Sequence, residues 1–315
     1  MKTTEKSVVE TDVHDNELSS NLQILRIKSL VGKTLFYSTI PCGFAILAYF
    51  SIQEVWAAAA ATVALGFVVL FVSFNVWTSS SSKLKKMLGQ NITKPILEDI
   101  FQVIDYLPES GIEVNLIHSS NLIHSWDTYS GSDFLQGKYK GIDVLYSDIH
   151  LQEKIEETDE EGKTQTRYET RFKGQWLICD FHKEFAAYLQ IRENRKRMIF
   201  KGYTKSKSDI QTENPEFNEK FQILTSDGHT AFYVLTPHFM EHIISTDTFA
   251  KAQSFFCFRD GKVHIALHSG RDSFELKGIR VNDLEEIRRD FRRELIHMTG
   301  IIDELLLNDK LFKEV

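Results

Sequence analysis

The chain has few cysteines, no excess of positive charge, and none of the glycine-rich loops that bind phosphate groups. Its three cysteines, Cys42, Cys179 and Cys257, are far apart and form no C-x-x-C pair, which argues against a disulfide framework and a zinc knuckle. A reducing compartment is therefore expected around Cys179 and Cys257. The net charge of −7 argues against binding duplex nucleic acid, because such proteins need a dominant positive face.

Several catalytic signatures are also absent. The sequence contains no G-x-x-x-x-G-K-[ST], no G-x-G-x-x-G and no G-x-S-x-G, so no motif indicates a P-loop enzyme, a dinucleotide-dependent enzyme or a serine hydrolase. No internal repeat occurs either. We expect no cofactor, and the length of 315 residues favours two structural units.

Two long uncharged runs stand near the N-terminus. Residues 35–52 and 55–77 are each long enough to cross a bilayer as a helix, and only Gln53 and Glu54 separate them. The first run begins more than thirty residues into the chain and has no small-residue cleavage site, which argues against a signal peptide. The sequence therefore predicts a transmembrane hairpin, with a buried soluble hairpin as the alternative.

The basic residues beside these runs predict the orientation of the hairpin. The connecting turn carries a glutamate and no base, whereas bases flank both outer ends: Arg26, Lys28 and Lys33 before the first run, Lys83, Lys85 and Lys86 after the second. By the positive-inside rule both termini face the cytoplasm. We expect a multi-pass protein of the cell inner membrane.

The composition divides the chain into four parts. We expect a polar tail without regular structure, followed by a short helix, over residues 1–31; the hairpin over 32–78; and a juxtamembrane linker over 79–91. Residues 92–315 form the predicted cytoplasmic domain. Its fold class is α+β, with a mostly antiparallel sheet, flanking helices and a long C-terminal helix.

Periodicity and turn residues predict the elements of this domain. Helices are expected over residues 92–107, from Pro237, and after a capping start at Asn282. A hairpin turns at Asp260-Gly261, and the acidic run 153–161 is expected to be a solvated loop. Further strands are predicted over residues 113–118, 141–153, 167–180, 185–191, 221–225 and 230–235.

Three segments resemble a known bacterial family. They are DFLQGKYKGIDVLYSDIHL (133–151), RFKGQWLICDFHKEF (171–185) and NPEFNEKFQILTSDGHTAFYVLTPHFMEHI (214–243). They are similar to the domain-of-unknown-function family 3137, whose members typically carry an N-terminal transmembrane pair. The resemblance covers about residues 92–276 and implies architecture and a membrane location, but no activity.

One motif has the form that some zinc hydrolases use. His238, Glu241 and His242 form H-x-x-E-H, in which two histidines bind zinc and the glutamate acts in catalysis. Thr236 and Pro237 favour a helix start, and on that helix the two histidines lie opposite the apolar side, on a face expected to be solvent-exposed. A third protein ligand is required, and the sequence singles out neither of the possible donors, Glu294 and Asp303.

Other polar residues have simpler interpretations. On a strand, Cys179 points away from the face that Asp180 and His182 share, so the three do not form a nucleophile–base pair. His264 and His268 share one face of a predicted strand. We expect a polar sheet face there, with a pH-sensitive or metal-binding surface as the alternative.

A basic segment follows the middle of the domain. Residues 192–207 hold seven bases and one acid, with Phe200 and Tyr203 interleaved. The bases are Arg192, Arg195, Lys196, Arg197, Lys201, Lys205 and Lys207. In an acidic, membrane-tethered chain this segment is a candidate for docking on anionic lipid head groups. An acidic partner, single-stranded nucleic acid, or a plain solvated loop are the alternatives.

These observations favour a membrane-anchored, non-enzymatic interaction or scaffolding protein. Its expected partners are the lipid bilayer and, beyond it, anionic lipid or another membrane protein. The competing hypothesis is a membrane-anchored, zinc-dependent hydrolase that uses His238, Glu241 and His242.

Overall fold

The computed structural model describes residues 2–158, 164–180, 188–193, 210–250, 252–276 and 283–306. The chain divides into two compact units. The first contains Met1–Thr93 and Leu276–Arg288, and the second contains Lys94–Glu275 and the chain from Arg289 onward.

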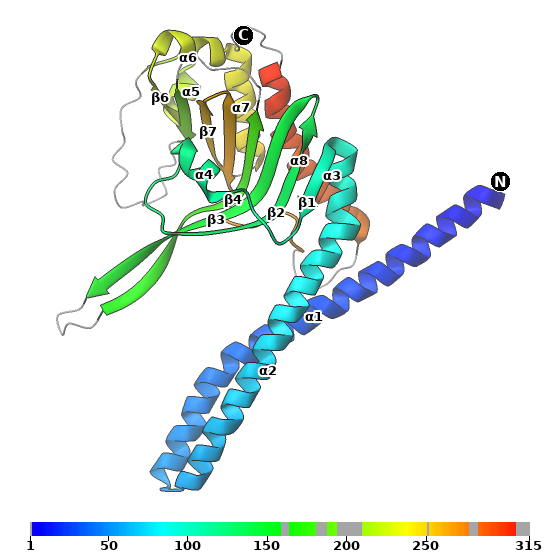
Figure 1. The fold of residues 1–315 in the computed structure, drawn as a ribbon, viewed down its shortest axis with the longest axis vertical. Coiled ribbons are helices and arrows are strands. Elements are labelled where there is room, and N and C mark those ends of the chain that lie inside the picture. Colours follow the sequence, from blue (N-terminus) through cyan, green and yellow to red (C-terminus); the bar gives the residue numbers. More distant parts are fainter. Residues whose placement is uncertain are drawn as a thin grey trace. The chain divides into compact units, whose positions relative to one another are not determined.

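The first unit is built on two long antiparallel helices, α1 (Lys2–Ile52) and α2 (Trp56–Leu88), and a π-helical turn η1 (Gly89–Thr93) follows them (Figure 1). The predicted two-helix hairpin is confirmed. Both helices extend further than predicted, because α1 includes the expected unstructured tail and α2 runs into the expected linker. Neither stretch contains a glycine or proline before Gly89, and adding residues to an existing helix costs far less than starting one.

The second unit contains one antiparallel eight-stranded sheet with the order β1-β2-β3-β4-β8-β7-β5-β6. This confirms the predicted α+β class. The strands are β1 (Gln102–Leu107), β2 (Thr128–Tyr139), β3 (Ile142–Thr158), β4 (Thr164–Asp180), β5 (Leu189–Glu193), β6 (Phe221–Thr225), β7 (Gln253–Arg259) and β8 (Lys262–His268).

Three element predictions in this unit are wrong. Residues 113–118 and 230–235, predicted as strands, lie mainly in helices, and the helix predicted over 92–107 ends early and continues as strand β1. Residues 113–118 and 230–235 are short, and periodicity in such short runs does not distinguish helix from strand. The helices are α3 (Lys94–Ile100), α4 (Val114–Ser120), α5 (Pro215–Lys220), α6 (Gly228–Val234), α7 (Pro237–Ala250) and α8 (Leu284–Leu306).

Two further differences concern β2 and the acidic run. Strand β2 was not predicted. The acidic run begins inside β3, which continues to Thr158, so the connection to β4 is shorter than the expected loop.

Local signals with a defined geometry are confirmed. Asp260 and Gly261 both have positive φ, 51° and 73°, as a two-residue hairpin turn requires. Thr236 caps α7, because its Oγ1 accepts a hydrogen bond from the Phe239 amide at 3.2 Å. Helix α8 also forms, but Asp283 provides its cap by accepting from the Glu285 and Glu286 amides; Asn282 lies outside the described residues.

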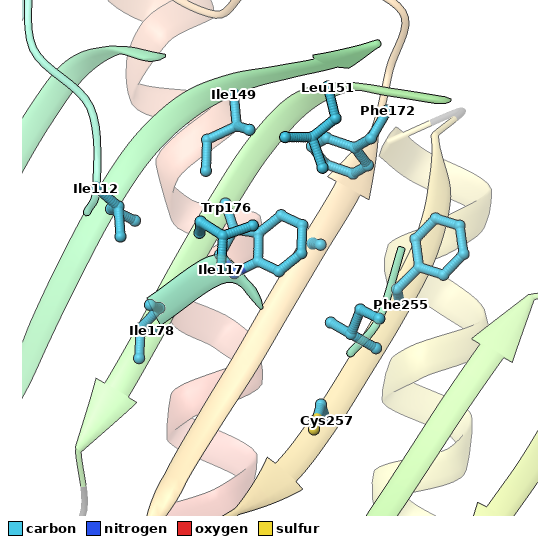
Figure 2. Packing of buried hydrophobic residues seen from close by; sticks show 11 residues of the cluster. Ile112, Ile117, Ile149, Leu151, Phe172, Trp176, Ile178, Phe255 and Cys257 are labelled. Atoms are coloured by element: carbon cyan, nitrogen blue, oxygen red, sulfur yellow. The ribbon is translucent and has the colours of Figure 1, made fainter. Parts of the chain in front are cut away.

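Both faces of the sheet are covered. On one face, Ile117 of α4 belongs to a buried cluster with Trp176, Ile178 and Phe255 (Figure 2). On the other face, α7 packs through Phe239 onto Phe258 of β7. Helix α8 packs there through Phe291 onto Phe274, which in turn contacts Tyr146 of β3. Polar side chains can therefore be buried on either face, as are Asp148 and His264.

Candidate functional site

Small residues hold the two long helices together at close range. A Cβ added to Gly32 of α1 would lie 2.8 Å from the backbone nitrogen of Trp77 and 3.1 Å from the carbonyl oxygen of Ser73 in α2. The hydroxyl groups of Ser29 and Ser81 lie 2.7 Å apart and form a hydrogen bond across the interface. Membrane helices associate in this way, because small residues let the backbones approach and polar side chains bond between helices.

The outer surface of the hairpin is apolar. In the most apolar 18-residue stretch of each helix, 0% of the residues are buried in α1 and 11% in α2. A helix in the core of a soluble protein would be mostly buried. Large side chains point outward along both helices: Phe44, Tyr49, Trp56, Leu65, Phe67 and Phe71. Soluble proteins rarely expose a contiguous apolar surface of this size to water. These two helices support membrane association.

Two residues from the C-terminal part of the chain, Leu276 and Arg288, bond to helix α1. Arg288 forms a two-pronged ion pair with Asp15, at 2.7 and 2.9 Å, and Arg26 donates to the carbonyl of Leu276 at 3.3 Å. The hydrogen bond to Asp15 is the main cause that raises the pKa of Arg288. The C-terminal part of the chain thus contributes to the unit that contains both apolar helices.

Within the described part of the chain, the H-x-x-E-H residues have no third ligand placed beside them. His238 and Glu241 are exposed, whereas His242 is partly buried with its ring against Gly300 of α8, where an added Cβ would come within 3.2 Å. His242 is therefore not on a solvent face as predicted. Of the possible third ligands, Asp303 accepts from Lys140 at 2.6 Å and from Tyr139 at 3.1 Å. Among the described residues, no group of three potential ligands is placed to hold a metal ion.

His264 and His268 form no solvated polar face, so that expectation is wrong. His264 is 2% exposed and accepts a hydrogen bond from the indole of Trp176 at 3.3 Å. Burial lowers the pKa of His264 to about 4, so its ring is neutral at physiological pH. His268 accepts from the amide of Lys173 at 2.8 Å. Both rings are buried because the cluster that contains Ile117 of α4 covers their face of the sheet.

Cys179 is buried in β4, and burial raises the pKa of its thiol. Asp180 pairs with Lys262 of β8 at 2.9 Å, and His182 lies outside the described residues. A buried thiol with a raised pKa is a poor nucleophile. The segment therefore has a structural role in the described part of the chain.

Arg192 stands apart from the other bases of its segment. It lies in strand β5 with 6% exposure, and its guanidinium donates to the carbonyl of Asn121 at 2.9 Å and contacts His124 at 3.2 Å. The remaining bases of the segment, Arg195, Lys196, Arg197, Lys201, Lys205 and Lys207, lie outside the described residues.

A buried polar cluster was missed by the sequence reasoning. Asp148 of β3 is 1% exposed, and its Oδ2 accepts from the amide of Ser273 at 2.7 Å. Gln175 of β4 donates to the hydroxyl of Ser273, and nearby Asp133 accepts from Tyr106 at 2.8 Å. The sequence did hold a usable signal: Asp148 lies two residues after Tyr146 in the predicted strand, so the two side chains share one face, and a buried Tyr146 implies a buried acid.

The position of Asp148 has an electrostatic consequence. Burial, together with the charges of Asp133 and Asp272, raises its pKa well above the ordinary value, and the hydrogen bonds from Ser273 only partly oppose this. A carboxyl group in such surroundings favours its neutral form. Folding is thereby linked to the uptake of a proton at this position.

We expect Asp148→Asn to change how stability depends on pH. The folded-state pKa of Asp148 lies above the unfolded one, so its contribution to stability is full below the unfolded pKa. That contribution is lost as the pH rises through the folded pKa. Asparagine keeps an acceptor for the Ser273 amide without the charge. The variant should therefore gain stability relative to wild type as the pH rises, measured by denaturant unfolding of the solubilised full-length protein.

Asp105→Asn is the matched control, because Asp105 is exposed on β1. Its unfolding free energy should follow the wild-type pH profile. Parallel profiles for wild type and Asp148→Asn would contradict the proton-linked role of Asp148.

Comparison with known proteins confirms the family resemblance. Residues 170–307 match the model of DUF3137, described as "Protein of unknown function (DUF3137)". Two of the three segments that carried the resemblance, 171–185 and 214–243, lie within the match, and 133–151 precedes it. Two N-terminal helices long and apolar enough to span a membrane accompany the match.

No curated protein matches the chain. Among solved structures, the crystal structure of the mycobacterial trehalose monomycolate transport factor A, TtfA, is similar with a TM-score of 0.34 and 11% identity. The similarity covers 68% of this chain and 94% of that chain. Similarity at this level carries no inference about this protein.

Proposed function

We propose that this chain, whose residues 170–307 match DUF3137, is a membrane-anchored, non-enzymatic interaction or scaffolding protein. The observation that carries the proposal is the helix hairpin, which packs internally through Gly32, Ser29 and Ser81 while its large apolar side chains face outward. Such a hairpin needs lipid around it. The sheet domain is then a module held at a membrane surface.

The proposed location is the cell inner membrane, with both termini in the cytoplasm. Bases lie beside the outer ends of both spans, and the turn between α1 and α2 has none. Positive charge near short loops favours the cytoplasmic side. The free cysteines Cys179 and Cys257 in the sheet agree with a reducing compartment.

The proposed docking element is the basic segment without Arg192. Arg192 is buried in the sheet and bonded to Asn121, so the bases proposed to bind lipid begin at Arg195. Bases near an anionic leaflet contribute about 1 kcal/mol each, and a bilayer anchor on the same chain raises the effective concentration of the segment at that leaflet. Anionic lipid head groups are therefore the ligand that we favour, ahead of an acidic protein.

We expect the basic segment to respond to anionic lipid. A polarity-sensitive fluorophore at Ser206→Cys, in a Cys42→Ser background of the full-length protein, should shift to the blue in nanodiscs containing anionic lipid. The shift should disappear in neutral lipid and at high salt, because the attraction is electrostatic. It should also weaken when Arg195, Lys196 and Arg197 become glutamine.

A fluorophore at Thr164→Cys serves as the control, because Thr164 is exposed in the sheet unit outside the basic segment. An identical response from both positions, or no response from Ser206→Cys, would reject lipid docking. The non-enzymatic part has its own test: stoichiometric zinc in the purified protein that His242→Ala removes would overturn it.

A further inference from the structure

Strands β3 and β4 extend beyond the rest of the sheet as a two-stranded arm (Figure 1). We define this arm as residues 153–158 and 164–171. Pairing between β2 and β3 ends at Gln152, and pairing between β4 and β8 begins at Gly174. Beyond these points the two strands pair only with each other among the described residues, from Glu153↔Glu169 to Thr158↔Thr164.

Hydrogen bonds at the base of the arm show which backbone groups point outward. The carbonyl of Gln152 and the amide of Lys154 both bond to Asp127, on the side of β3 away from β4. Their partners across the ladder are Thr170 and Tyr168. In an antiparallel ladder such pairs are not hydrogen-bonded to each other. The N–H and C=O groups of Thr170 and Tyr168 therefore point to the outer edge of β4. Because every second residue does the same, those of Thr166 and Thr164 also point to this edge.

The residues along this edge are complementary to themselves in the antiparallel direction. With Tyr168 placed opposite Tyr168 of a second copy, Thr166 lies opposite Thr170 and Arg167 lies opposite Glu169. The outward-pointing groups of Tyr168, Thr166 and Thr170 then bond across the new ladder. Arg167 and Glu169 fall at the close, non-hydrogen-bonded positions, where opposite charges stabilise a pair of strands.

We propose that two copies of this chain associate through the outer edge of β4, joining their arms into a four-stranded antiparallel sheet. A strand edge with unpaired backbone groups is a template for another strand. A twofold interface requires a self-complementary surface, which the order Arg167-Tyr168-Glu169 supplies. Anchoring both copies in one bilayer raises their effective concentration, so a short interface suffices.

In the single chain, Arg167 already contacts Glu157 at 3.0 Å and Glu169 at 3.1 Å. These contacts keep both charges on one face of the arm, where Arg171 also approaches Glu169 at 3.7 Å. Tyr168 is 54% exposed on the other face. In the dimer these side chains share or exchange their intrachain contacts with those of the second copy, and the backbone of the arm keeps its pairing. The dimer is independent of lipid docking by the basic segment.

The test is cross-linking of the full-length protein in its membrane. With a short bismaleimide, Tyr168→Cys in a Cys42→Ser background should give a covalent dimer, because the two positions meet at the twofold axis. Adding Arg167→Glu places an acid opposite Glu169 of the other copy at both symmetry-related positions. This should lower the dimer yield roughly tenfold. Adding Glu169→Arg as well restores opposite charges and should restore the yield.

Thr158→Cys is the matched control, exposed on the β3 side of the same arm. Dimer from Tyr168→Cys no greater than from Thr158→Cys would overturn the proposal. A dimer yield unchanged by Arg167→Glu would also overturn it. So would a yield from the double exchange no higher than that from Arg167→Glu alone. Because Arg167 and Glu169 also contact each other within one chain, the fold of the arm needs its own readout. A disulfide between Thr158→Cys and Thr164→Cys, whose hydroxyl oxygens lie 3.2 Å apart, should form equally well with and without Arg167→Glu.

Discussion

Gly174→Ala is expected to destabilise the sheet unit by roughly 3 kcal/mol or more. A Cβ at this position would lie 2.1 Å from the carbonyl oxygen of Leu267 and 2.9 Å from the amide nitrogen of Ser269. Both are backbone atoms of or just after β8, so no side chain can swing away to make room. The φ of Gly174, +153°, lies at the edge of the region that favours glycine.

Thermal unfolding of the solubilised protein measures this effect. For a unit of this size, such a loss lowers the melting temperature by roughly 6–12 °C. Gly270→Ala is the matched control, because Gly270 has a φ of +75° but no atom within 4 Å of the added Cβ. It should cost only the backbone strain, about 1–2 kcal/mol. Equal losses at both positions would show that the close approach of β4 and β8 is not the cause.

Gly32→Leu is expected to separate α1 from α2. The added side chain would begin 2.8 Å from the Trp77 backbone nitrogen, and overpacking of this kind typically costs about 1–3 kcal/mol. The aromatic rings beside the contact, Phe36, Phe74 and Trp77, lie 5.8–6.4 Å from one another and would have to shift with the helices. The hairpin would then lose its close contact while its outer surface remained apolar.

A disulfide across the interface reports this change. Ser29→Cys with Ser81→Cys should oxidise readily, because the two hydroxyl oxygens lie 2.7 Å apart, and the yield should fall several-fold in the Gly32→Leu protein. Gly43→Leu is the matched control in the same helix, since nothing lies within 4 Å of its added Cβ. A yield that drops equally in both variants would contradict the role of Gly32.

The elements that the sequence predicted correctly are those with strong local causes. The uncharged runs after residue 35, the Asp260-Gly261 turn and the Thr236 cap each depend on neighbours in the chain. The errors fall on short apolar segments such as 230–235, whose state depends on what packs against them. The acidic run at Glu153 shows the same limit, because pairing with β4 keeps its first residues in a strand.

The candidate sites divide in the same way. Sequence pattern placed His264 and His268 on one face of a strand, and the structure agrees that they share it. It could not show that α4 and its neighbours cover that face, nor that His242 rests against Gly300. Asp148 became significant only when Asp133 and Ser273, distant in sequence, were found beside it.

The sequence by itself determined the hairpin of two long apolar helices, the α+β class and the family resemblance, because run length, turn chemistry and strand alternation are local properties. Only the tertiary structure decided the strand order, the burial of both sheet faces and the β3–β4 arm that extends past them. Periodicity shows which residues share a face, but what covers a face depends on contacts between segments far apart in the chain. The buried carboxyl group of Asp148 follows from such contacts, and so does the edge at Tyr168, which pairs with no further strand in the described part of the chain.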